Sequence, residues 1–188
     1  MGAVRERIRC ILFAVALLAG CQSGSGDMIA HAGPERAAAL VAFYARQVGA
    51  ADRRMGPDGD VSFGESGLYY DAAKDVLYGR VYVNMARIKD APPARLDAYR
   101  RMAVALNDPA VGGMFDRGGG YFVLDENRQG YFLVRPFSVP HTTPESLDRD
   151  MARMRAVAAR WNSEWFFTVA MIMHGNRKPP ERPVPLPD

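Results

Sequence analysis

Cysteine is nearly absent from this sequence. Its two cysteines, Cys10 and Cys21, both lie in the first 21 residues, so the remainder has no disulfide, no thiol nucleophile and no thiolate metal site. Histidine is also scarce: His31, His141 and His174 have no partner at metal-ligand spacing, and we expect no bound metal. The domain must therefore be stabilised by its apolar core alone.

The sequence also lacks an apolar run long enough to be read as a membrane-spanning helix. The run Ile11–Ala19 has roughly half of the 20 or so residues that spanning requires. It follows Arg5, Arg7 and Arg9 and leads into Leu18–Cys21, the order of a bacterial export signal. We therefore expect residues 1–20 to be a cleaved signal peptide. An uncleaved anchor and an ordinary soluble signal peptide are the alternatives.

The stretch Leu18–Cys21 resembles the lipobox of bacterial lipoproteins. The resemblance implies cleavage between Gly20 and Cys21, and a covalent diacylglyceryl and N-acyl lipid on Cys21. We expect no other cofactor. More than one buried acyl chain makes membrane attachment effectively stable. Gln22, where inner-membrane lipoproteins carry aspartate, implies sorting to the outer membrane, with the domain facing the periplasm.

An excess of charge of one sign is missing once the export signal is set aside. The formal net charge of +3 comes largely from three arginines of the signal, and the rest of the chain is nearly balanced. A nucleic-acid surface needs clustered lysine and arginine. We therefore expect no nucleic-acid partner.

Apolar periodicity predicts one α+β domain at 34–175, between a flexible tether at 21–33 and an extended, proline-rich tail at 176–188. Helices are predicted at 34–48, 94–106 and 144–174. Strands are predicted at 61–63, 68–70, 76–83, 121–124 and 131–134, the last limited by Pro136 or placed at a sheet edge. We expect a twisted antiparallel sheet of about five strands with helices packed on one face.

The last predicted helix combines an apolar stripe with an aromatic cluster. The stripe recurs at steps of three and four: Leu147, Met151, Met154, Ala158, Trp161, Trp165 and Val169. The cluster Trp161, Trp165, Phe166 and Phe167 spans just over two turns, so its members cannot all lie on one narrow stripe. We interpret the cluster as core or, where exposed, as a candidate partner-binding surface.

No segment carries a strong catalytic signature. The glycine-rich stretch Gly112–Gly120 precedes a predicted strand and has no nearby lysine, so it fits a turn or bulge better than a phosphate loop. If the protein were a hydrolase, Asp116 within that stretch would be the residue on which its activity depends. Because no segment carries a strong catalytic signature, we expect no catalytic residues and no enzyme.

From Leu68 to about Gly175, the order of elements resembles that of type III secretion chaperones and the related YbjN-like domains. The stretches that carry the resemblance are Ala105–Asn107 at a helix end, the hairpin Tyr121–Arg135 and the helix start Thr143–Leu147. The resemblance implies a small α+β protein-binding module, often dimeric, without catalytic residues.

Together these features predict a non-enzymatic, lipid-anchored protein-binding domain of the bacterial envelope. A concrete version is a pilotin-like or chaperone-like accessory factor for an envelope or secretion assembly, with an envelope protein as partner and a homodimer as a further option. Two alternatives stay open: a small periplasmic hydrolase using the Gly112–Gly120 loop, and a purely structural envelope lipoprotein.

Overall fold

The computed structural model describes residues 33–85, 91–127 and 129–186. The export signal, Gly20, Cys21 and the tether before Gly33 lie outside the described residues. The helices are α3 (Pro34–Gln47), α4 (Pro93–Asn107), α5 (Pro144–Arg160) and α6 (Phe166–Met173), with short turns η1 (Gly112–Met114), η2 (Val139–His141) and η3 (Trp161–Trp165). The strands are β1 (Asp60–Phe63), β2 (Ser66–Asp71), β3 (Val76–Met85), β4 (Tyr121–Asp125) and β5 (Gly130–Ser138). The expected order of elements is confirmed.

The five strands form one antiparallel sheet in the order β1-β2-β3-β5-β4. Strand β3 lies at the centre and pairs with both β2 and β5. Its pairing with β5 shifts between Tyr82 and Asn84, an irregularity that adds twist to the sheet. The predicted α+β class with a five-stranded antiparallel sheet is therefore confirmed.

Strand β5 runs further than the sequence indicates, because it passes through Pro136 to Ser138. Strand β4 pairs with β5 only as far as Val134, so beyond that point β5 has β3 as its one neighbour. Proline, which lacks an N–H, is tolerated where a strand lies at an edge. Strand β5 therefore lies between two strands up to Val134 and forms an edge of the sheet from Arg135 to Ser138.

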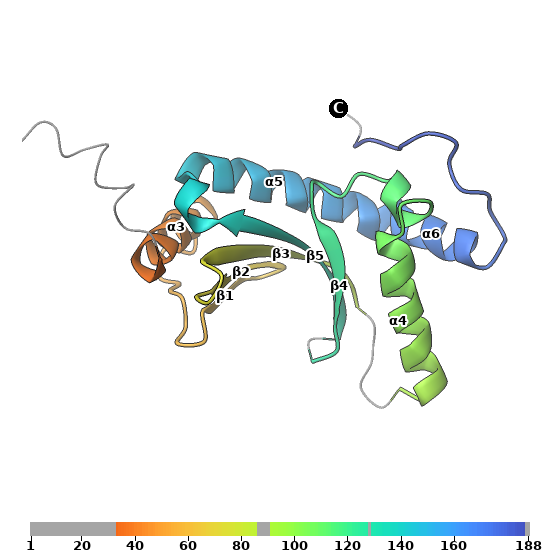
Figure 1. Ribbon diagram of the computed structural model, residues 1–188, viewed down its shortest axis with the longest axis horizontal. Coiled ribbons are helices and arrows are strands. Elements are labelled where there is room, and N and C mark those ends of the chain that lie inside the picture. The colour runs from red at the N-terminus through yellow and green to blue at the C-terminus, as the bar shows by residue number, and fades with distance from the viewer. Residues whose placement is uncertain (1–32, 86–90, 128, 187–188) are drawn as a thin grey trace, which may run out of the picture.

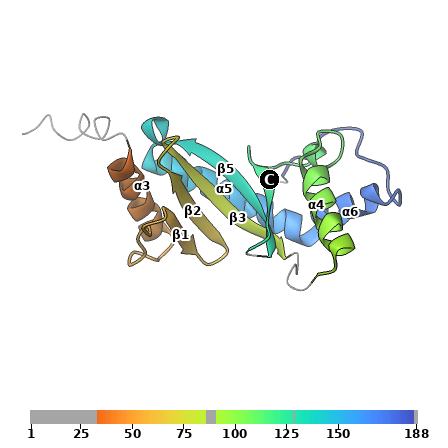
Figure 2. The same ribbon diagram turned by 60° about the horizontal axis from the view of Figure 1, so that its bottom comes forward.

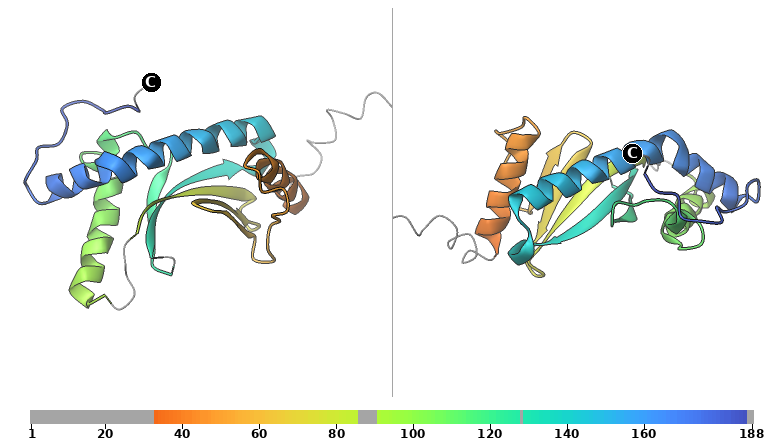
Figure 3. Two further views of the ribbon diagram at one scale, coloured as in Figure 1. Left: turned by 180° about the vertical axis from the view of Figure 1, so that it is seen from behind. Right: turned by 90° about the horizontal axis from the view of Figure 1, so that it is seen from above.

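Helices α3, α4 and α5 pack on the same face of the sheet, and α6 extends beyond the strands to contact α4 (Figure 1). Helix α5 continues through η3 into α6 and crosses the strands as one long rod, seen from above in Figure 3. Helix α3 lies at the β1–β2 end of the sheet, and α4 stands beside β4 and α6 at the other. In the described part of the chain, no helix is long and apolar enough to cross a membrane.

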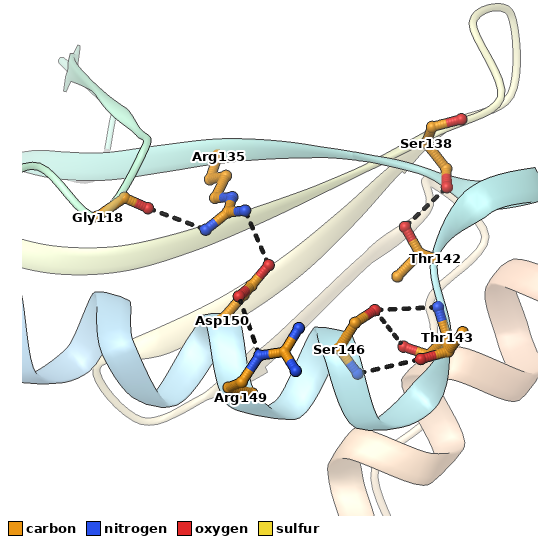
Figure 4. A network of polar contacts seen from close by, with 8 residues as sticks. All are labelled: Gly118, Arg135, Ser138, Thr142, Thr143, Ser146, Arg149 and Asp150. Atoms are coloured by element: carbon orange, nitrogen blue, oxygen red, sulfur yellow. Dashed lines mark hydrogen bonds and ion pairs between the residues drawn. The ribbon is translucent and has the colours of Figure 1, made fainter.

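The start of α5 follows the prediction. Thr143 is the N-cap, with Pro144 at the first helical position. The Thr143 hydroxyl accepts the N–H of Ser146, and the Ser146 hydroxyl accepts the N–H of Thr143, which is a capping box (Figure 4). The apolar stripe of the rod is buried along its whole length, from Leu147 to Val169. This stripe is the main layer over the sheet.

Gly79 sets how closely α5 approaches the sheet. A methyl group at this position would lie 2.4 Å from the sulfur of Met151 and 2.7 Å from the ring of Phe137. Both neighbours are buried. A glycine in the central strand therefore makes room for the helix side chains above it.

The rod contains one feature that the sequence pattern did not predict. The backbone N–H of Phe166 bonds to the carbonyl of Trp161, so Trp161–Trp165 is a π-helical turn with one additional residue. Trp161 and Trp165, the first and last residues of this turn, both face the core. The predicted α-helix at 144–174 is thus two α-helices joined by a π turn.

Candidate binding surfaces

The face of the sheet opposite the helices carries a band of aromatic and aliphatic side chains. Strand residues alternate between the two faces, so this band consists of every second residue of β2, β3, β4 and β5. Its members are Tyr69, Tyr78, Tyr82, Tyr121, Val123, Phe132, Val134 and Pro136. We call this set the open face. Figure 2 shows the sheet from this side, with α5 behind the strands.

Neighbouring rings of the open face contact one another across strands. Tyr69 stacks on Tyr78 with ring centroids 6.3 Å apart, and Tyr82 meets Phe132 edge-on at 5.8 Å. Tyr69, Tyr121 and Val123 are 40%, 40% and 38% exposed. Among the described residues, no helix covers these side chains. The open face is therefore a largely apolar surface held by a rigid sheet.

The charges beside the open face are paired. Arg80 of β3 forms an ion pair with Asp60 of β1, so the central cation of the face is neutralised. The ammonium group of Lys74 lies 5.9 Å from the ring of Tyr78 and pairs with Asp71 at 3.0 Å. Burial raises the pKa of the Tyr121 hydroxyl, so that group remains a neutral hydrogen-bond donor at physiological pH. A molecule that binds the open face would therefore be held mainly by apolar contacts.

The structure divides the aromatic cluster of the last helix. Trp161 and Trp165 are fully buried and contact each other at 5.6 Å, and the Nε1–H of Trp161 donates to the carbonyl of Asp116 at 2.9 Å. As candidate partner-binding residues these two are corrected: they form core, because both belong to the apolar stripe that the helix buries against the sheet. Phe167 is 69% exposed, so it alone of the cluster fully reaches solvent.

Phe166 has an intermediate position. It is half-buried and lines an apolar cavity of about 240 Å³ between α4, α6 and the sheet, together with Tyr99 and Met102. The buried ring of Tyr131 closes the cavity floor, 5.2 Å from Phe166, and its hydroxyl donates to the carbonyl of Tyr99 at 3.0 Å. A partner role for Phe166 and Phe167 stays a prediction.

Asp116 is held by many partners. Its carboxylate accepts the N–H of Gly118 at 2.6 Å and pairs with Arg153 at 3.0 Å. Partial burial alone would raise the pKa of Asp116, but the hydrogen bonds from the Gly118 and Leu186 backbones and the ion pair with Arg153 hold it below its usual value. A carboxylate occupied in this way stabilises the loop, and the geometry does not favour it as a catalytic acid or nucleophile.

The loop after η1 is also tied to the sheet and to α5 by Arg135. The guanidinium donates to the carbonyl of Gly118 at 2.9 Å and pairs with Asp150 at 2.8 Å (Figure 4). A glycine is favoured at 118 because its φ is +57°, in the left-handed region where side chains bearing a Cβ are strained. The glycines therefore shape a turn, as the sequence suggested, and no phosphate-binding helix follows them.

Asn107, at the end of α4, pairs with the outer edge of the sheet. Its side-chain amide donates to the carbonyl of Phe122 at 2.8 Å, and its side-chain oxygen accepts the Phe122 N–H at 2.8 Å. The side chain thus replaces a neighbouring strand near the start of β4. This contact limits strand addition at that edge and leaves the open face as the more accessible surface.

The sequence reasoning missed the open face, although its signal was present. In β3 the tyrosines Tyr78 and Tyr82 alternate with Leu77 and Val81, so both sides of the strand are apolar or aromatic. A strand covered on one face only is expected to be polar on the other. The departure from that rule, repeated in β4 by Tyr121 and Val123, marks an additional apolar surface.

No family model matches this chain, and no curated protein matches it. Two solved structures have a similar fold. One is the structure of the HopA1–SchA chaperone–effector complex, with 16% identity, a TM-score of 0.45, and 66% of this chain and 91% of that chain covered. The other is the crystal structure of the ExsC–ExsE complex, with 17% identity, a TM-score of 0.47, and 70% and 94% covered. Both likenesses concern the arrangement of helices and strands alone.

Proposed function

We propose that this chain is a lipid-anchored protein-binding domain of the bacterial envelope, and that the open face of the sheet receives the partner. The observation that carries the proposal is the cross-strand band of partly exposed aromatic side chains. Contiguous exposed apolar patches on a folded domain mark interaction sites. Tyrosine and phenylalanine are also enriched in protein interfaces, where their rings bury large areas at low entropic cost.

The partner is an envelope protein that presents an apolar strip to this face. Arg80 is already neutralised by Asp60, so among the described residues the centre of the face offers no unpaired cation for an acidic ligand. Binding through such a surface depends little on ionic strength, because charge screening acts on exposed, unpaired charges. We therefore expect the complex to persist in high salt and to dissociate in mild detergent.

The membrane anchor rests on the sequence before the domain. The lipobox-like Leu18–Cys21 and the glycine- and serine-rich sequence that follows support a lipid on Cys21 and a tether that holds the domain away from the bilayer. The outer membrane, facing the periplasm, is the proposed location, because Gln22 follows Cys21. A pilotin-like or chaperone-like accessory role for an envelope assembly agrees with this arrangement.

Anchoring is tested by fractionation. Wild-type protein should appear in the outer-membrane fraction and incorporate labelled palmitate, whereas Cys21→Ser should be unlabelled and keep its unprocessed size. A second cysteine variant, Cys10→Ser, is the matched control and should be processed and labelled like wild type. Labelled Cys21→Ser protein of mature size would contradict the anchor.

Partner binding is tested by site-specific photo-crosslinking in intact cells. A photoreactive residue placed at Tyr69 or Tyr121 should give one discrete adduct, and the same probe at Val104 of α4, which is 71% exposed, should not. The double variant Tyr121→Ser/Val123→Ser should abolish the adduct formed from position 69. Equal adducts from Val104, or an adduct that survives the double variant, would refute the open face as the binding surface. An adduct with twice the mass of the chain would identify a homodimer as its occupant.

A further inference from the structure

The end of the chain returns to the glycine loop and pairs with it. After α6 the tail runs back over the molecule toward η1, as the dark blue trace in Figure 1 shows. Val184 forms a parallel bridge with Phe115: its N–H donates to the carbonyl of Met114 at 2.6 Å, and its carbonyl accepts the N–H of Asp116 at 3.0 Å. The tail is therefore attached to the domain as a one-residue strand.

The sequence of the tail suits this arrangement. Prolines 183 and 185 are exposed, and the aliphatic side chains of Val184 and Leu186 are half-buried against the core. Prolines have no N–H, so only Val184 and Leu186 can donate in this segment. Both do so, Val184 to the loop and Leu186 through its backbone to the carboxylate of Asp116. The segment binds as an extended peptide ligand would, with alternate side chains inward.

The site around the tail is larger than the tail itself. Residues 113–117, Gly119, Gly120 and Pro183–Pro185 line an open groove of about 680 Å³. The tail forms one wall of this groove and leaves the rest free. An incoming segment could therefore enter beside the tail before the tail is released.

We propose that this groove binds an extended protein segment in which prolines alternate with aliphatic residues, and that the chain's own tail occupies the site as an internal competitor. The groove and the open face belong to different parts of the molecule, so this proposal does not depend on the proposed function. Residues 176–182, the first part of the tail, link the bridged segment around Val184 to the domain. A linker of this kind gives the tail an effective concentration of about a millimolar at the groove.

The two tryptophans of the chain supply a direct signal. The ring of Phe115, the residue bridged to Val184, lies 5.6 Å from both Trp161 and Trp165. The carbonyl of Asp116 accepts the Trp161 Nε1–H. Release or replacement of the tail therefore changes the surroundings of both tryptophans, and intrinsic fluorescence reports occupancy of the groove.

The experiment titrates the peptide Glu-Arg-Pro-Val-Pro-Leu, the sequence of residues 181–186, into full-length protein in detergent. A variant that ends at Arg182 should bind it at least about tenfold more tightly than wild type, because the internal competitor is gone. Val184→Asp should give the same gain, which keeps the test valid if the truncated chain folds poorly. Glu181→Ala, a change at an exposed position of the tail that does not line the groove, should bind like wild type.

A peptide with aspartate in place of its valine is the ligand control and should not bind. Failure of both the truncated variant and Val184→Asp to bind the natural peptide at millimolar concentration would overturn the proposal, as would equal affinity for wild type and variants. Sedimentation of the same samples tests a second occupant. A wild-type dimer that Val184→Asp converts to monomer would mean that the tail occupies a neighbouring copy, which contradicts internal competition.

Discussion

The two faces of the sheet are built from the same strands and differ in almost every other respect. The covered face presents Leu68, Leu77 and Leu133, which are fully buried beneath the helices. The open face presents rings that are partly exposed and contact one another only along the sheet. Alternation along a strand thus produces two apolar surfaces with separate purposes. One stabilises the fold, and the other is left available for a partner.

The largest difference between the faces is expected from truncation of adjacent residues in β5. Leu133→Ala removes a fully buried side chain and should lower the free energy of unfolding by about 2–5 kcal/mol. Val134→Ala, one residue along on the open face, should cost less than about 1 kcal/mol. Urea unfolding followed by circular dichroism measures both. Equal losses would show that the open face is covered in the folded protein.

A smaller effect is expected where the helix layer touches the sheet. Gly79→Ala adds a methyl group into the contact with Met151 and Phe137, and should destabilise the protein by about 1–3 kcal/mol through overpacking. Tyr78→Ala, the preceding residue on the open face, is the control and should cost less. A neutral Gly79→Ala variant would mean that α5 can move away from the sheet without loss.

A smaller contribution to the free energy of unfolding is expected from the contact between Asn107 and the edge strand β4. Asn107→Ala removes both hydrogen bonds to the Phe122 backbone and should cost about 1–2 kcal/mol, measured by urea unfolding. Asn107→Asp is the informative comparison, because a carboxylate can accept the Phe122 N–H but cannot donate to its carbonyl. If both hydrogen bonds contribute, the free energy of unfolding of Asn107→Asp should lie between those of wild type and Asn107→Ala.

Asp116, in the loop beside α5, should contribute about 1 kcal/mol to the free energy of unfolding, as expected for a charge-assisted hydrogen bond, and this contribution should depend on pH. Its pKa is lowered in the folded protein, so this contribution is fully present above the usual aspartate pKa, near 4, and is lost as the pH falls through the lowered folded value. Asp116→Asn should therefore be less stable than wild type at pH 7 and approach it below pH 4. Thermal unfolding across this range tests the sign. A constant difference at all pH values would contradict the ionic role.

The smallest effect on stability is expected for the open face itself. Tyr121→Ser/Val123→Ser changes two exposed residues, and each should alter the free energy of unfolding by no more than about 0.5 kcal/mol. The same variant is expected to lose the partner in crosslinking. A large loss of stability would assign these side chains to the fold and remove the contrast between the two faces.

Much of the fold followed from periodicity. The predicted helices at 34–48 and 94–106 differ by one residue at an end from Pro34–Gln47 and by one at each end from Pro93–Asn107. Thr143 and Pro144 marked the start of α5 because capping depends on local chemistry alone. The antiparallel arrangement followed from hairpin spacing.

The π turn and the attachment of the tail did not follow from the sequence. The number of residues in a helical turn at Trp161–Trp165 depends on which rings the core accepts, and that is a property of the packed structure. The pairing of Val184 with Phe115 joins segments far apart in the chain, so no local pattern reports it. For the same reason the aromatic cluster could be recognised but not divided into buried and exposed members.

The π turn also determines how the rod between Leu147 and Val169 tolerates changes in length. A regular α-helix advances about 100° per residue, whereas the wider turn at Trp161–Trp165 takes up one additional residue without adding that rotation. Deleting Ser163, which is exposed, would convert the turn to ordinary α-helix and leave Val169 facing the core. The same deletion elsewhere in α5 would rotate every later side chain by about 100°. The rod should therefore tolerate the loss of one residue at this turn better than anywhere else along its length.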